Sequence, residues 1–101
     1  MRYYYTNNII SMTLFGYNIE VANVGGRQWR LAIVEQKGAV MNSFTKVGEY
    51  ENADYGEVPG TTMFWNFDRA PTLGTVIKTI KEHKANRAEH EEFMKLIGAK
   101  A

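Results

Sequence analysis

The side chains with the widest catalytic use in this sequence are two histidines, His83 and His90. On a continuous helix their spacing would place them about 10.5 Å apart along the axis. Zinc binds imidazole nitrogen at about 2.0–2.1 Å, so these two side chains cannot share one zinc ion. The sequence has no cysteine that could complete a thiolate site. We therefore expect both histidines to lie in solvent and the chain to hold no metal.

A second group of reactive side chains is the acidic segment Glu51-Asn52-Ala53-Asp54-Tyr55-Gly56-Glu57. A helix–loop–helix calcium site needs carboxylates at alternate positions, a glycine at about the sixth position and a glutamate at about the twelfth. The spacing here does not match, and the flanking sequence is not helical. We interpret the segment as an acidic surface loop that can address a basic partner surface.

The sequence pattern gives no support for a catalytic nucleophile or a phosphate-binding loop. Ser11 and Ser43 lie in strand-like runs without the Gly-x-Ser-x-Gly turn that exposes a catalytic serine. The tripeptide Gly25-Gly26-Arg27 is not a Walker pattern, and no helix follows it. We expect a binding protein that has no enzymatic activity and no cofactor.

The composition is typical of one small folded domain. The 101 residues include 12 basic and 11 acidic side chains, a formal net charge of +1, and 45% hydrophobic residues. This chain is apolar enough to fold and much less basic than domains that bind duplex DNA. No apolar run reaches the roughly 18 residues of a membrane helix, and no secretory signal is visible. We expect a cytoplasmic protein that makes no membrane contact.

The first half of the sequence, residues 1–47, is patterned as an antiparallel meander. Apolar and polar residues alternate in four runs, at 10–14, 17–22, 29–33 and 40–45. Gly25-Gly26 suits a tight hairpin, and Lys37-Gly38 marks a further turn. In the third run Trp29, Leu31 and Ile33 share one face, so Arg30 is expected to point outward into solvent.

The rest of the sequence predicts a loop, one strand and a helical part. Residues 48–60 lack alternation and predict a long acidic loop, whereas residues 61–67 predict a strand. Residues 72–97 predict two helices, the first with Thr72 as its N-cap and apolar residues at i, i+3, i+4 and i+7 from Leu73. The apolar stripe then fails, so we place a break near residues 84–86, with one long helix as the alternative.

The expected fold is therefore a single α+β domain over residues 1–101. It contains an antiparallel four- to five-stranded meander, one helix packed on a face of the sheet, and a second, C-terminal helix. The strand at 61–67 and the last helix carry surplus apolar side chains. Homodimerisation is a hypothesis that follows from this surplus.

The leading functional hypothesis is a regulator or inhibitor that occupies the surface of a partner protein, as virus-encoded and mobile-element accessory proteins do. Consecutive strand residues alternate faces, so at least one residue of the tyrosine run is expected to be exposed, where tyrosine is an efficient contact residue. An edge strand of the sheet is the alternative interpretation of this run. The expected contact residues are the tyrosine run and the acidic segment: Tyr3, Tyr4, Tyr5, Glu51, Asp54, Tyr55 and Glu57.

Two alternatives use basic residues instead. A single-stranded nucleic-acid-binding module would stack bases on aromatic side chains of the sheet and follow the phosphates with basic ones. A small-molecule or nucleotide binder would hold its ligand at a dimer cleft with Arg27, Arg30 and tyrosines. The residues expected to serve these alternatives are Arg27, Arg30, Lys37, Phe44 and Lys46.

Overall fold

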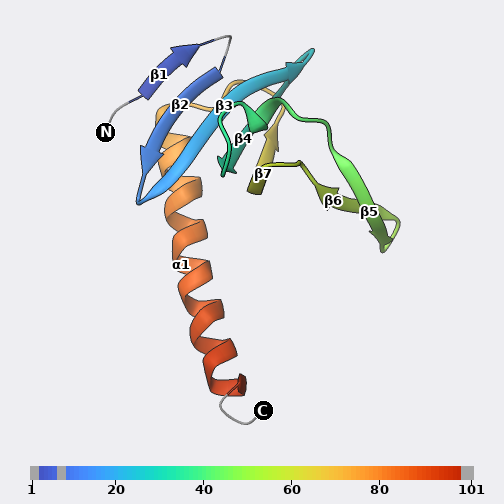
Figure 1. The fold of residues 1–101 in the computed structure, drawn as a ribbon, viewed down its shortest axis with the longest axis vertical. Helices are drawn as coiled ribbons and strands as arrows, with labels where there is room; N and C mark the ends of the chain where they lie inside the picture. The colour runs from blue at the N-terminus through green and yellow to red at the C-terminus, as the bar shows by residue number, and fades with distance from the viewer. Residues whose placement is uncertain (1–2, 7–8, 99–101) are drawn as a thin grey trace. The chain divides into compact units, whose positions relative to one another are not determined.

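A five-stranded antiparallel sheet is the largest part of the fold (Figure 1). The protein is described by a computed structural model that covers residues 3–6 and 9–98. The strand order is β1-β2-β3-β4-β7. The strands are β1 Tyr3–Thr6, β2 Ile9–Leu14, β3 Tyr17–Gly25, β4 Gln28–Val34 and β7 Thr61–Phe67. An antiparallel α+β fold is thereby confirmed, with β1 as an edge strand.

The hairpin between β3 and β4 turns where the two glycines predict it. Gly25 and Gly26 have φ angles of 140° and 54°, which residues with a Cβ rarely adopt. The Asn23 side chain holds the turn, because its Oδ1 accepts the Gly25 N–H at 2.9 Å and its Nδ2 donates to the Gly26 carbonyl at 3.0 Å. The predicted glycine turn is confirmed.

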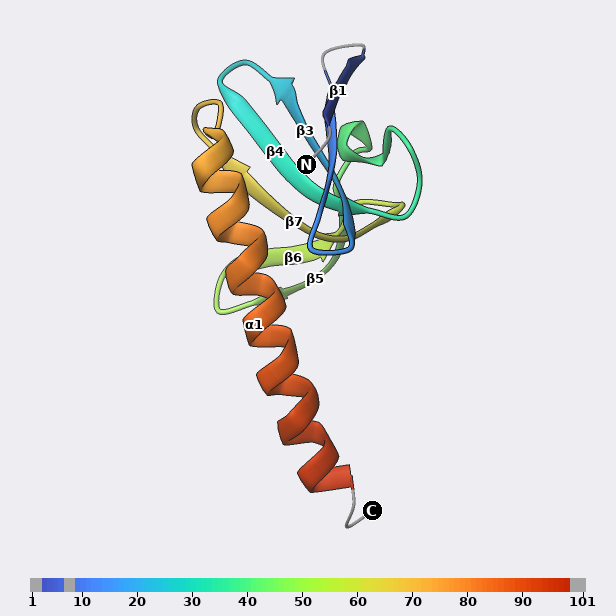
Figure 2. The same ribbon diagram turned by 90° about the vertical axis from the view of Figure 1, so that its left-hand side faces the viewer.

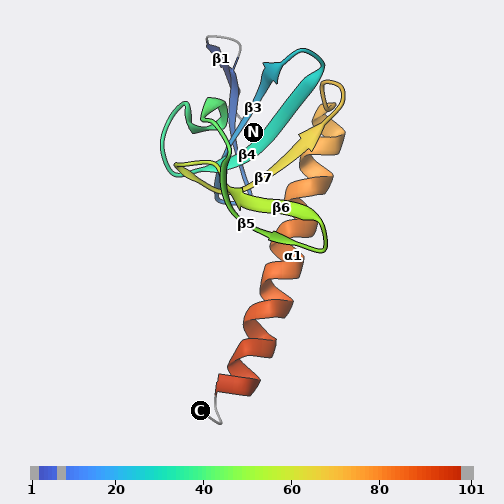
Figure 3. The same ribbon diagram turned by 90° about the vertical axis from the view of Figure 1, so that its right-hand side faces the viewer.

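Residues 45–57 form a second, two-stranded sheet, which corrects the prediction of a long loop over 48–60. Figure 3 shows it as a separate ribbon made of β5 Thr45–Tyr50 and β6 Ala53–Glu57. The turn residues Glu51 and Asn52 both have left-handed φ angles, 50° and 64°, as two-residue hairpins require. Gly48 and Gly56 interrupt the apolar alternation, and this hid both strands from sequence reasoning.

The fourth predicted strand, at 40–45, is also wrong. Ala39–Met41 forms the short 3-10 helix η1, and only Thr45 of the predicted run belongs to a strand. Gly38 starts this turn with a φ of 84°. In Figure 2 the green turn of η1 lies against β3 and β4. We refer to residues 38–42, which cross this face of the sheet, as the ridge.

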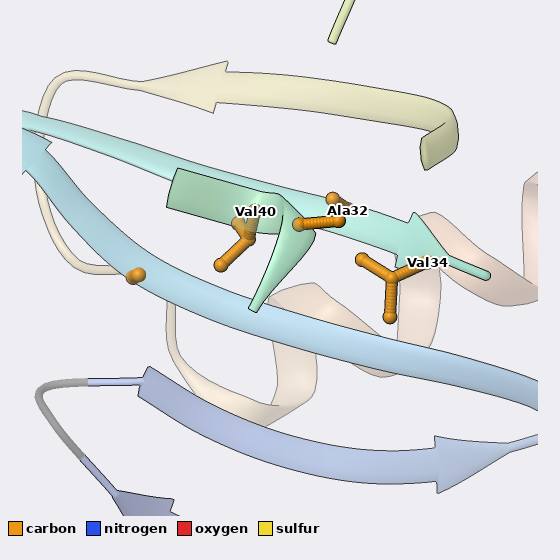
Figure 4. Close-up of a cluster of buried hydrophobic side chains, with 5 residues drawn as sticks. Ala32, Val34 and Val40 are labelled. Atoms are coloured by element: carbon orange, nitrogen blue, oxygen red, sulfur yellow. The ribbon is translucent and has the colours of Figure 1, made fainter. Parts of the chain in front are cut away.

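The ridge covers a small apolar core on one face of the sheet. Val40 is fully buried, and Figure 4 shows its side chain beside those of Ala32 and Val34. Small alanines on β3 and β4 leave room for the ridge to approach the sheet closely. The cluster consists of Ala22, Ala32, Val34, Ala39 and Val40, with Ile9 and Phe64 packed at its margin.

Two buried charged side chains hold the backbone of the ridge. Glu20 is 3% exposed, and its carboxylate accepts the N–H of Gly38 at 2.8 Å and of Val40 at 3.2 Å. Arg30 is 9% exposed, and its guanidinium donates to the carbonyls of Val40 at 2.9 Å and Asn42 at 2.8 Å. Trp29, Leu31 and Ile33 do lie on the opposite face, but the prediction that Arg30 points into solvent is wrong because the ridge covers it.

The helical part is one helix, α1 Leu73–Gly98, and not two (Figure 1). The predicted N-cap is confirmed, since Thr72 Oγ1 accepts the Thr75 N–H at 3.2 Å. The segment near residues 84–86 is rich in strong helix formers, and an Arg87–Glu91 ion pair at 3.0 Å supports the next turn. The end of the apolar stripe therefore marks the start of an exposed stretch and not the end of a helix.

The chain forms two compact units, residues 1–71 and 72–101. The packing of the helix on a sheet face stays a prediction.

Arg30→Met should lower the free energy of unfolding by about 2–4 kcal/mol, because two carbonyls lose a charged donor. Urea unfolding followed by tryptophan fluorescence measures the change. Arg27→Met removes the same charge from an exposed turn and should change stability by less than about 0.5 kcal/mol. Equal effects of the two substitutions would show that the hydrogen bonds from Arg30 to the ridge do not stabilise the fold.

Ala85→Gly should lower the helicity and cost about 1 kcal/mol of stability, because position 85 lies inside a continuous helix. Circular dichroism and thermal unfolding report both quantities. Ala70→Gly lies in the segment before the helix, so it measures the part of the stability loss that comes from the greater flexibility of the unfolded chain. If Ala85→Gly lowers the stability no more than Ala70→Gly does, the predicted break near residues 84–86 would be right after all.

Candidate binding groove beside the β5–β6 hairpin

The β5–β6 hairpin buries neither of its faces. The side chains of Val47, Tyr50 and Tyr55 are 62%, 70% and 54% exposed. The hairpin contains one lysine and four carboxylates, a net charge of −3. A two-stranded hairpin is marginally stable in water by itself, and exposed apolar side chains on it are typical of a contact surface.

A groove of 650 Å³ lies between this hairpin and β7. Its volume is within the range of about 300–1,000 Å³ found for ligand sites. The hairpin supplies Asp54, Tyr55 and Glu57, and the sheet supplies Arg30 and Phe64. The complete lining is Gln28, Arg30, Phe44, Asp54, Tyr55, Gly56, Glu57, Thr61, Thr62, Met63, Phe64 and Asn66.

Aromatic rings form much of the apolar lining. Phe44 meets Phe64 edge to face, with ring centroids 6.2 Å apart. The Arg30 guanidinium carbon lies 5.3 Å from the centroid of Phe64, so this ring already contacts one cation. Tyr55 lies across the hairpin from Gly48 in the strand register, and a Cβ at Gly48 would come within 2.7 Å of the tyrosine Oη. The glycine therefore makes room for the ring.

The charges in the groove differ in how far they are already partnered. Burial lowers the pKa of the Arg30 guanidinium, and its buried Nε is without a hydrogen-bond partner among the described residues. The Asp54 carboxylate binds the Lys46 ammonium at 2.9 Å. Glu57 is exposed and makes no ion pair within residues 9–98. Glu57 is thus the carboxylate most available to an incoming cation.

The groove combines residues that the sequence assigned to different functions. Asp54, Tyr55 and Glu57 were expected to bind a protein, and Arg30 and Phe44 to bind nucleic acid, yet all five line one surface. The other expected site residues with described side chains are not part of the groove lining, although Lys46 is ion-paired with Asp54. Glu51 is at the tip of the hairpin, Arg27 is in the β3–β4 turn, Lys37 lies before the ridge, and Lys46 is on β5.

The tyrosine run can be placed only by its backbone. Tyr3, Tyr4 and Tyr5 belong to edge strand β1, with Tyr3 opposite Met12 and Tyr5 opposite Ile10. Their side chains lie outside the described part of the chain.

The remaining candidates contribute little to a site. His90 is exposed and His83 is half-buried, both on α1. Across residues 3–6 and 9–98, no three His, Asp or Glu side chains come close enough together to hold a metal ion. No helix within those residues has the length and apolar character needed to cross a bilayer.

Three important residues escaped sequence reasoning: Glu20, Phe64 and Asn66. Phe64 and Asn66 are on β7 and line the groove, and Glu20 holds the ridge. A weak signal existed for Glu20, because it is the one acidic residue in an otherwise uncharged strand at 17–25.

A comparison of the chain with family models, curated proteins and solved structures found no match.

Gly48→Ala should displace the Tyr55 ring, because the new methyl group would overlap it. The ring proton resonances of Tyr55 should shift and the hairpin amides should exchange faster. Val47→Ala, at an exposed position next to Gly48, should leave both unchanged. Unshifted ring resonances in the Gly48 variant would show that the ring does not lie over the glycine.

Proposed function

We propose that this protein is a non-enzymatic regulator or inhibitor that binds a partner protein, and that the groove receives a basic side chain of that partner. The observation that carries the proposal is the exposed β5–β6 hairpin, which presents apolar and acidic side chains together beside a groove lined by aromatic rings. Such a surface gives a partner both apolar contact and charge complementarity.

A lysine or arginine side chain fits the chemistry of this groove. Its cationic head would pair with Glu57, and its methylene groups would pack on Tyr55 and Phe44. The net charge of −3 on the hairpin attracts basic surfaces before contact is made. The same charge disfavours the approach of a nucleic-acid backbone.

The state of the basic residues also favours a protein partner over single-stranded nucleic acid. Arg30 is buried and donates to two carbonyls, so little of it is available to a phosphate. Lys46 is paired with Asp54. A protein that binds along the phosphates of a nucleic acid needs a row of several available basic side chains, and the groove does not offer them.

The test uses two labelled peptides of equal length, one alternating Arg with Gly and one alternating Glu with Gly, in fluorescence anisotropy titrations. We expect the basic peptide to bind saturably and the acidic one not to bind. Tyr55→Ala and Glu57→Gln should each weaken binding about tenfold, since each removes a principal contact.

Glu51→Gln is the matched control. It removes one charge from the same hairpin outside the groove, so it should weaken binding less than about twofold. A labelled single-stranded oligonucleotide is titrated in parallel. Equal losses in the Glu51 and Glu57 variants, or tighter binding of the oligonucleotide than of the basic peptide, would refute the proposed groove function.

A further inference from the structure

A second hollow lies on the other side of the ridge from the groove. It has a volume of 510 Å³ and is formed by β2, β3 and residues 34–37. Its described lining includes the polar residues Ser11, Thr13, Asn18 and Glu20, which the strand register places on one face of the sheet. The remaining lining is Met12, Ile19, Val34, Glu35, Gln36 and Lys37. Of the residues expected to bind a protein partner, Glu51, Asp54, Tyr55 and Glu57 do not border this hollow.

Glu20 is unusual among the groups that line the hollow, because it is 97% buried and carries a charge. Its two oxygens each accept one backbone N–H from the ridge. A carboxylate has about four acceptor positions, so roughly half of its hydrogen-bonding capacity remains. The buried carboxylate thus has room for further donors from the hollow.

The charge of Glu20 is not neutralised by any cation within the described residues. No ion pair joins it to Arg30, whose guanidinium donates to the backbone carbonyls of Val40 and Asn42. Lys37 also lines the hollow and makes no ion pair with a carboxylate of residues 9–98. Buried charges are normally paired, because an isolated charge away from water is costly.

From these observations we infer that the hollow binds a small organic cation, with a primary ammonium group against Glu20 and the rest of the molecule among Ser11, Thr13 and Asn18. The ammonium supplies three donors, which match the free acceptor positions of the carboxylate and the hydroxyl oxygens beside it. The apolar side chain of Val34, which belongs to the cluster of Ala32 and Val40, suits a short alkyl chain attached to the ammonium.

The test is an NMR titration of the whole chain with n-butylammonium chloride at constant ionic strength. The amides of Gly38 and Val40 serve as reporters, because both donate to Glu20. We expect saturable shifts at these two amides. n-Butanol has the same chain without the charge, and it should bind at least about tenfold more weakly.

Glu20→Gln keeps the size of the side chain and one carbonyl acceptor but removes the charge, and it should weaken binding about tenfold. Since this variant also loosens the ridge, Thr13→Trp provides an independent test. It fills the hollow from an exposed position while leaving Glu20 intact, and it should abolish the shifts.

Glu51→Gln is the matched control, because it removes the same charge outside both the hollow and the groove and should bind the probe as the wild type does. Absence of saturable shifts, equal binding of n-butanol, or binding retained in the Thr13 variant would overturn the inference. The basic-peptide titration of the Glu57 variant reports separately on the groove, so the two proposals can fail independently.

Discussion

The backbone N–H and C=O groups of Val40 are held by two side chains of opposite charge, and the covered face of the sheet depends on this arrangement. The Glu20 carboxylate accepts a hydrogen bond from the N–H of Val40, and the Arg30 guanidinium donates one to the carbonyl of Val40. Each charge would be costly if buried without hydrogen bonds, and the ridge backbone supplies two hydrogen bonds to each. In return the ridge is fixed over Ala22 and Ala32, whose small side chains allow close approach. One face of the five-stranded sheet thereby gains a packed layer from the ridge alone.

The alternation of apolar residues predicted β2, β3, β4 and β7 because one face of the sheet is continuously apolar. The prediction for Arg30 was wrong because the alternation of residues assigns each side chain to one of the two faces of the sheet but does not show whether that face is covered. The covering residues lie 18 and 20 positions from Glu20 and 10 and 12 positions from Arg30, beyond any local pattern. The undivided helix was only the alternative interpretation for a related reason, since loss of an apolar stripe reports exposure and not backbone conformation.

The groove could be predicted only as separate parts. The acidic segment was visible in the sequence, but its glycines concealed a hairpin in which Tyr55 packs against Gly48. Phe44 follows the ridge and Phe64 lies on β7, so their edge-to-face contact depends on tertiary structure. Sequence reasoning therefore assigned basic and acidic residues to rival functions, whereas folding places members of both sets along one surface.

The ridge is hydrogen-bonded to Glu20, which lines the hollow, and to Arg30, which lines the groove. Asn42 ties the end of the ridge to the Pro59 carbonyl at 2.6 Å, next to the start of β7. If the affinities of the two proposed ligands both depend on the position of the ridge, each ligand must change the affinity of the other by the same factor. A single short segment held by two opposite charges is therefore the place where thermodynamic reciprocity between the hollow and the groove would arise.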